Sequence, residues 1–287
     1  MPVHNGAPFV TASIGSILAQ TLRDFELVIV NDGSSDGTGT LLDSLAEKDS
    51  RLRIIHLPQN LGIVGALNRG LESCSGQYIA RMDGDDIARR DRLTLQVAFL
   101  DENPDFVACG SDLIFFGARY WYARYPRTDV ECKSLLALYP CLSHPATTIR
   151  RNAMECIDYK SDYSLAEDYR LWLDLAPLGK FANLPRPLTF YRIHPSQIST
   201  ASNNNQRKVH VRIAAESLAS FGLSHFSAED VTRFVWPAMA NEPMTRREYL
   251  EHAIGFSGAL WNINQGRCRW LRARLLRVTM RNLLFLQ

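Results

Sequence analysis

Residues 77–86 read QYIARMDGDD, an apolar run that ends in three acidic residues around one glycine. The run from Tyr78 to Met82 suits a strand covered on both faces of a sheet. Ligands of open α/β sheets bind at the carboxyl ends of strands, where Asp83, Asp85 and Asp86 stand. Neighbouring carboxylates repel one another unless a cation lies between them, and oxygen ligands suit Mg²⁺ or Mn²⁺. A solvated acidic turn is an equal alternative from these residues alone.

The composition is typical of a soluble globular protein, with 46% hydrophobic and 22% charged residues among 287. The 32 basic and 30 acidic residues leave a net charge of +2, so no nucleic-acid partner is expected. Six scattered cysteines without a CxxC pair indicate reduced thiols. Without a signal peptide or a run that could span a bilayer, a cytoplasmic location is expected.

Strand and helix patterns alternate in the first eighty residues. Strands are predicted at the start of the chain and at residues 25–30, 53–57 and 77–82, with helices between them. This alternation predicts an α/β fold with a mainly parallel central sheet and flanking helices. The first strand is either short or lacks residues that precede Met1. The polar run Asn203–Asn205 then leads into several helical segments, so an α/β domain is expected over residues 1–202 and a helical region over 203–287.

Four motifs occur in order along the chain: PVHN (2–5), VNDGSSDGT (30–38), RMDGDD (81–86) and AEDYRLWLDLA (166–176). Together they resemble a family-2 glycosyltransferase with the GT-A fold, and the resemblance covers about residues 1–200. It implies transfer of a sugar from a nucleotide-diphosphate donor to an acceptor hydroxyl. It also implies Mn²⁺ or Mg²⁺ at the diphosphate.

The donor-binding residues that the resemblance implies are Pro2, Val3, His4, Asp32, Asn60, Gly62, Asp83, Gly84 and Arg192. Asp32 would accept a hydrogen bond from the ring NH of uracil, although an Asx turn or helix cap is equally natural there. Residues 2–4 would border the base, where a tyrosine is commoner than His4. Asn60 and Gly62 would lie near the base, and a helix-entry turn explains them about as well.

The resemblance also divides the roles of the acidic stretch. Asp83 would contact the ribose or donor, Asp85 would bind the metal, and Asp86 would be an outer-shell or capping residue. Gly84 stands where a small residue lets the donor approach closely. The cation would neutralise the charge that develops on the leaving nucleotide diphosphate.

Further candidates are weaker. His194 follows a strand and would complete the metal shell or contact the diphosphate, with a solvated loop histidine as an equal alternative. Additional phosphate contacts are expected from Arg192 and Ser199, and acceptor contacts or loop packing from His144, Thr147 and Arg151.

The second half of the chemistry is predicted at Glu167 and Asp168. An attacking acceptor hydroxyl must lose its proton, so a carboxylate within hydrogen-bond reach is needed. The resemblance places this base at Asp168, with Glu167 positioning the acceptor or the base. Two acids in the first turn of a helix, stabilised by its dipole, are the structural alternative. A single base without a covalent nucleophile implies inversion of the anomeric centre.

From Arg267 onward the chain carries six arginines and no acid. An apolar stripe is predicted at Ala273, Leu276, Met280 and Leu283. Such a helix either lies on an anionic membrane surface, as would suit a lipid-linked saccharide acceptor on the inner face of the membrane, or packs on the α/β domain with its arginines at the solvated edge.

The function predicted is metal-dependent, inverting transfer from a UDP-sugar to a saccharide or lipid-linked saccharide in cell-surface glycan assembly. A nucleotidyltransferase shares the sheet and the acids, but should carry a glycine-rich basic loop that PVHNGAPF lacks. A non-catalytic relative that binds nucleotide-sugar or glycan is the third possibility.

Overall fold

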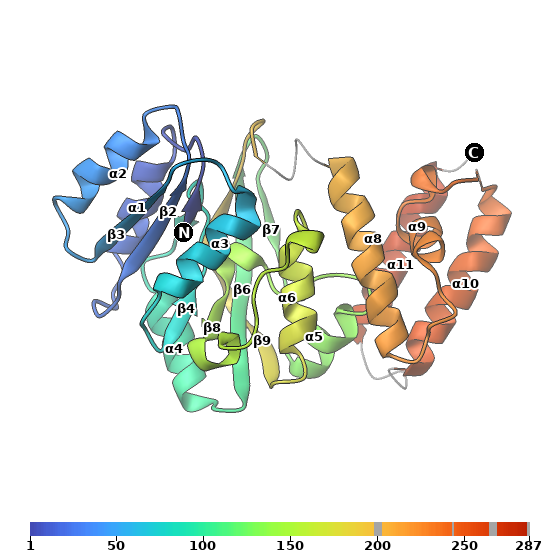
Figure 1. Ribbon diagram of the computed structural model, residues 1–287. Helices are drawn as coiled ribbons and strands as arrows, with labels where there is room; N and C mark the ends of the chain where they lie inside the picture. Colours follow the sequence, from blue (N-terminus) through green and yellow to red (C-terminus); the bar gives the residue numbers. More distant parts are fainter. Residues whose placement is uncertain (198–202, 243, 264–268, 286–287) are drawn as a thin grey trace.

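The computed structural model describes residues 1–197, 203–242, 244–263 and 269–285 (Figure 1). Two sheets form the α/β part of the molecule, and a group of helices at the C-terminal end packs against one side of it (Figure 1).

The first sheet is parallel, in the order β1 (Pro2–Val3), β2 (Leu27–Asp32), β3 (Leu52–Leu57). All six residues of β2 are buried because helices cover both of its faces. Ile29 packs in one apolar cluster with residues of α1 (Val10–Leu18) and α2 (Thr38–Ala46). The neighbouring Val30 faces α3 (Gly62–Ser73), since a Cβ on Gly70 would lie 3.5 Å from its side chain.

The second sheet is mixed, in the order β4-β8-β6-β9-β5, with β7 paired to β6. Its strands are β4 (Tyr78–Ala80), β5 (Ile87–Ala88), β6 (Phe106–Gly117), β7 (Trp121–Ala123), β8 (Thr148–Arg150) and β9 (Lys180–Ile193). Only β6 and β9 pair in parallel there, and the other pairs are antiparallel. Pro185 and Pro187 lie in β9 beside register shifts, as expected of residues that lack an N–H donor.

The predicted α/β class with C-terminal helices is confirmed, while parallel pairing is limited to three strand pairs. The strand predicted over 77–82 did not extend the parallel sheet. It pairs antiparallel with β8, a strand some seventy residues further on, and the first sheet stops at β1. The remaining short elements are α4 (Arg92–Glu102), α5 (Asp129–Leu135), α6 (Glu167–Leu175), and 3₁₀ turns at His144–Ala146, Arg151–Met154, Ser161–Tyr163 and Pro237–Met239.

The C-terminal helices are α8 (Asn203–Ser220), α9 (Ala228–Val235), α10 (Arg246–Ile263) and α11 (Arg269–Phe285). They share one apolar cluster with the α/β part: Trp172 of α6 and Phe181 of β9 belong to the same cluster as Phe234 and Phe256. The division at residue 202 stays a prediction.

The stripe predicted on the last helix is not the packed face of α11. Leu275, Val278 and Asn282 are buried, whereas Leu276 and Met280 are 56% and 61% exposed. Leu283, the last position of the predicted stripe, is partly buried against the shared apolar cluster, and α11 contacts α5, α9 and α10. Arg267 lies outside the described residues, as do the side chains of Arg269 and Arg272. Within the described segments, no helix combines the length and apolarity that a bilayer crossing requires.

Candidate active site

A cleft of about 1220 Å³ runs along the ends of both sheets. Its walls come from distant parts of the chain: the β1 end, the loop after β4, the start of α6, the β6–β7 hairpin and the C-terminal helices. Of the site residues predicted above, the cleft is lined by Pro2, Val3, His4, Asp32, Asn60, Gly62, Asp83, Gly84, Asp85, His144, Glu167, Asp168 and His194.

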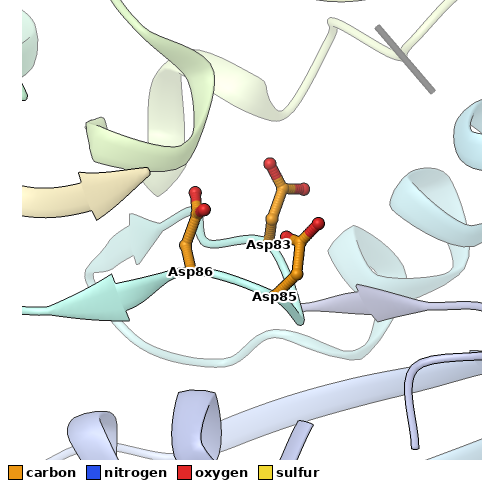
Figure 2. A group of neighbouring side chains, drawn as sticks. All are labelled: Asp83, Asp85 and Asp86. Atoms are coloured by element: carbon orange, nitrogen blue, oxygen red, sulfur yellow. The ribbon is translucent and has the colours of Figure 1, made fainter. Parts of the chain in front are cut away.

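The acidic loop lies between β4 and β5, and its carboxylates point to the same side (Figure 2). Asp83, Asp85 and Asp86 each place a carboxylate oxygen within 4.8 Å of the others. Gly84 is needed for packing: a Cβ there would lie 2.8 Å from the Val3 side chain. Close packing against Val3 is therefore a second reason for a glycine here, beside the predicted close approach of a donor.

The three acids make different contacts. Asp83 Oδ1 accepts from the Arg81 guanidinium at 2.5 Å, and Asp85 Oδ2 lies 2.9 Å from His194 Nε2. Asp86 accepts from the Arg192 backbone N–H at 2.8 Å. Burial and, secondarily, the charge of Asp83 raise the pKa of Asp85, and the same causes raise that of Asp86 well above its usual range.

The chemistry of this donor set fits a divalent cation. Oδ2 of Asp86 is buried without a hydrogen-bond partner. The pKa values of Asp85 and Asp86 are raised first by burial and then by the neighbouring acids, and a bound cation would offset both effects. Asp85 and His194 both line the cleft, and metal binding by this pair stays a prediction.

Arg192 supports the loop from behind. Its Nε donates to the Asp85 carbonyl at 2.8 Å, and its guanidinium lies between the Phe9 and Phe116 rings, 4.8 and 4.5 Å from their centroids. Arg192 is not one of the described residues that line the cleft. The contacts describe a residue that orients Asp85 and Asp86, and phosphate contact by Arg192 stays a prediction.

The predicted nucleotide end is built on Asp32 at the end of β2. Its side chain is 3% exposed, and Oδ1 accepts from the Leu61 N–H at 2.6 Å. His4 Nδ1 lies 2.7 Å from the Asp32 carbonyl, which fixes the imidazole at the rim. Asn60 accepts from the Gly62 N–H at 2.7 Å, and Gly62 has φ +76°, so this pair forms the turn into α3. In the described chain no hydrogen bond uses Oδ2 of Asp32.

Glu167 and Asp168 form the first turn of α6, after Leu165, whose φ of +79° is unusual for a side chain of this size. Burial raises the pKa of Glu167 to about 7, with the charge of Asp168 as the second cause. Burial likewise raises the pKa of Asp168 to about 6, although the Tyr169 N–H donates to its Oδ1 at 2.7 Å. Glu167 Oε2 is buried without a partner. A carboxylate with a pKa near 6 is suited to accept a proton at neutral pH.

Arg81 joins the two acidic segments and was missed by the sequence analysis. Its side chain is 8% exposed, and its positive charge lowers the pKa values of both Glu167 and Asp168 against the larger effect of burial. Nε and Nη1 have no hydrogen-bond partner. The available signal was an arginine inside an otherwise apolar strand run, which requires a buried counter-ion.

Of the weaker candidates that the structure describes, His144 lines the cleft, whereas Thr147 and Arg151 do not. His144 is buried in the cleft wall, 2.7 Å from the Tyr159 hydroxyl, and burial lowers its pKa well below its usual range. Thr147 donates to the Ser143 carbonyl and Arg151 to the Gly76 carbonyl, and neither is among the described lining residues. Ser199 lies outside the described residues.

Residues 1–158 match the sequence profile of Glycosyl transferase family 2. An uncharacterized glycosyltransferase of Haemophilus influenzae is 33% identical over 234 residues, which are 76% of this chain and 72% of that protein. The amylovoran biosynthesis glycosyltransferase AmsE of Erwinia amylovora is 29% identical over 210 residues, covering 71% of this chain and 78% of AmsE.

Solved structures share the fold. Residues 1–349 of S. aureus TarS in complex with UDP-GlcNAc superimpose with a TM-score of 0.65 at 15% identity, over 97% of this chain and 87% of that one. The mannosyltransferase PcManGT of Pyrobaculum calidifontis, in complex with GDP-Man and Mn²⁺, gives 0.58 at 19% identity, over 98% and 85%. The profile match, the relatives and the GT-A architecture agree, and the chain belongs to glycosyltransferase family 2.

Proposed function

We propose that this enzyme transfers a sugar from a UDP-sugar to a hydroxyl of a saccharide or lipid-linked saccharide, with inversion, in cell-surface glycan assembly. The observation that carries the proposal is the pairing, in one cleft, of a clustered acidic loop with a buried carboxylate of raised pKa, Asp168. The UDP-GlcNAc complex of TarS supports a UDP-sugar as donor, and the name of AmsE supports a role in polysaccharide biosynthesis.

In the proposed reaction the acceptor oxygen attacks the anomeric carbon while the bond from that carbon to the diphosphate breaks. Asp168 accepts the hydroxyl proton, and Glu167 positions the acceptor or the base. Asp83, held by Arg81, faces the donor, and Asp32 takes the uracil NH. A divalent cation at Asp85 and His194 would offset the charge that develops on the departing UDP. One displacement inverts the anomeric centre.

Replacing the base tests its role. We expect Asp168→Asn to lower the transfer rate by about 10²–10⁴-fold, because the acceptor hydroxyl then has no proton acceptor, while UDP affinity is unchanged. UDP release from a panel of UDP-sugars with saccharide acceptors measures the rate, and calorimetry measures UDP binding. Asp162→Asn, an exposed acid six residues earlier, is the matched control. Near-normal transfer by Asp168→Asn would contradict the assignment, and pyrophosphate release would indicate a nucleotidyltransferase.

The same substitution should stabilise the free protein at alkaline pH. Because burial raises the Asp168 pKa to about 6, the folded state binds a proton more tightly than the unfolded state, and stability falls as pH rises from about 4 to about 6. Asp168→Asn removes this loss, so its free energy of unfolding at pH 8 should exceed that of the wild type by about 1–3 kcal/mol. Urea unfolding at pH 8 and pH 4 measures it, and the gain should vanish at pH 4. An equal effect at both pH values would show that the charge is not its source.

The cation is tested at Asp85. We expect Mn²⁺ to strengthen UDP binding by the wild type at least tenfold over EDTA, because the ion screens the diphosphate, and we expect Asp85→Asn to lose this difference. Titration calorimetry with UDP, with Mn²⁺ or EDTA, gives both values. Asp105→Asn, a surface acid paired with Lys180, serves as the control. If Asp85→Asn kept the full Mn²⁺ effect, the ion would be held elsewhere.

Contact with a membrane surface is supported by the exposed apolar side chains of α11. Leu276, Met280 and Leu284 are 56%, 61% and 75% exposed, and the exposed Arg277 lies beside them. We expect the wild type to float with phosphatidylglycerol-containing vesicles, because the apolar face of α11 enters the lipid interface. The double variant Leu276→Asp/Met280→Asp should stay unbound, because its face carries two negative charges. Leu178→Asp, a similarly exposed leucine of the α/β part, should bind like the wild type. Absence of the wild type from the vesicle fraction would refute the contact.

A further inference from the structure

The cleft extends past Asp168 into a region that the donor and metal residues do not occupy. Its walls there are mostly aromatic and apolar side chains from the segment 121–143, which also contributes Arg124 and Ser143. The C-terminal helices add Gln206 of α8 and Arg274 of α11. The family profile covers residues 1–158 only, so Arg274 lies outside the matched segment.

Arg274 reaches the cleft across Tyr139. Its guanidinium carbon lies 4.4 Å from the centroid of that ring. Nε is buried without a hydrogen-bond partner. These contacts hold the guanidinium plane at the wall and leave donor capacity unused.

A counter-ion for Arg274 is missing from the described part of the chain. The ion pairs found there join other arginines to acids, as Arg127 is joined to Asp112 and Arg170 to Asp174. Arg281, two helical turns further along α11, donates to the Val235 carbonyl instead. Arg274 is thus a half-buried cation whose contacts with the protein are aromatic. A planar guanidinium in this state is suited to bind a carboxylate or phosphate with two parallel hydrogen bonds.

Tyr125 lines the same cleft as Arg274 and Asp168. Burial is the main cause that raises the pKa of the Tyr125 hydroxyl, and a hydrogen bond with Ser143 lowers it. The charges of Asp168 and Arg274 then act on the same hydroxyl in opposite directions. Asp168 and Arg274 thus line one cleft with Tyr125, the first expected to receive the acceptor proton and the second without an ion-pair partner among the described residues.

A purely structural role would be to attach α11 to the α/β part. That attachment already has Leu275 and Val278, both buried in the shared apolar cluster, and the packing of α11 against α5, while Asn282 joins α11 to α9 by donating to the Phe234 carbonyl at 2.8 Å. None of these contacts requires a cation in the cleft.

We propose that Arg274 binds an anionic substituent of the acceptor, a carboxylate or a phosphate, and so selects acidic saccharides as acceptors. The proposal rests on the proposed glycosyl transfer at this cleft. It assigns to the C-terminal helices a part in acceptor specificity, with the sugar hydroxyl at Asp168 and the anionic group at Arg274.

The test compares matched acceptors in the full-length protein with Mn²⁺ and the preferred UDP-sugar. A neutral hexose, the corresponding uronic acid and the hexose 6-phosphate are the probes, and acceptor-dependent UDP release is measured. We expect at least tenfold higher kcat/KM for one of the charged acceptors than for the neutral one. We expect Arg274→Met to remove this preference, mainly through KM, while activity with the neutral acceptor and acceptor-free hydrolysis of the UDP-sugar stay within about twofold. Arg274→Lys should restore part of it, because the charge returns without the planar donors.

Arg277→Met, an exposed arginine one turn further along α11, is the control and should keep the preference. The uronate and phosphate arms identify which anion is recognised. Equal kcat/KM for neutral and charged acceptors in the wild type, or an equal loss for both in Arg274→Met, would overturn the proposal. Absence of any UDP release by the wild type would refute glycosyl transfer itself, which separates the two failures.

Discussion

The ion pair between Arg81 and Asp83 is the interaction on which the arrangement of the site depends. It sits between two acidic segments, residues 83–86 and 167–168, whose carboxylates repel one another in a partly buried cleft. The positive charge of Arg81 offsets part of that repulsion, because it lowers the pKa values of Glu167 and Asp168 at the start of α6. The raised pKa values that remain show that one guanidinium does not balance all the acids. Burial of these acids lowers the stability of the free protein, as is common at functional sites.

A buried polar network holds Arg81 in place. The backbone N–H of Arg81 donates to the Thr147 carbonyl, and Nη2 of Arg92, a fully buried residue of α4, donates to the Arg81 carbonyl at 2.6 Å. Gln96, one turn later, donates to the Ala146 carbonyl at 2.7 Å. These bonds use backbone groups just after the end of β4 and just before the start of β8. The strand ends are therefore rigid where the acidic loop leaves the sheet, and rigidity of this kind preorganises a site.

The C-terminal helices share in the site as well as in the core. Gln206 of α8 donates to the carbonyl of Leu165 at 2.9 Å, which supports the strained residue before Glu167 and Asp168. Arg274 of α11 completes the far wall of the cleft. Since Phe234 and Phe256 belong to the same apolar cluster as Trp172, displacement of the helices would expose the core beneath α6. Catalytic and C-terminal parts are physically coupled at this face.

Local sequence patterns predicted the elements well, because helix and strand periodicity is a short-range property. The strands predicted at 25–30, 53–57 and 77–82 are present as β2, β3 and β4, and the ordered motifs identified the family. The sequence also led to the acids at 83–86 and 167–168. Each group has an ordinary structural explanation, as a polar turn or as the first turn of a helix, and the order of the family motifs favoured the functional one.

Pairing and burial were decided only by the tertiary structure. The partner of residues 78–80 is β8, and no local pattern encodes which distant strand an apolar run will join. The roles of Arg81 and Arg274 also depend on the tertiary structure, because the energetic effect of a charge is set by the groups around it and by its loss of water. Residue types and spacing thus determined the family and the chemistry on offer, whereas long-range packing decided which charges meet in the cleft.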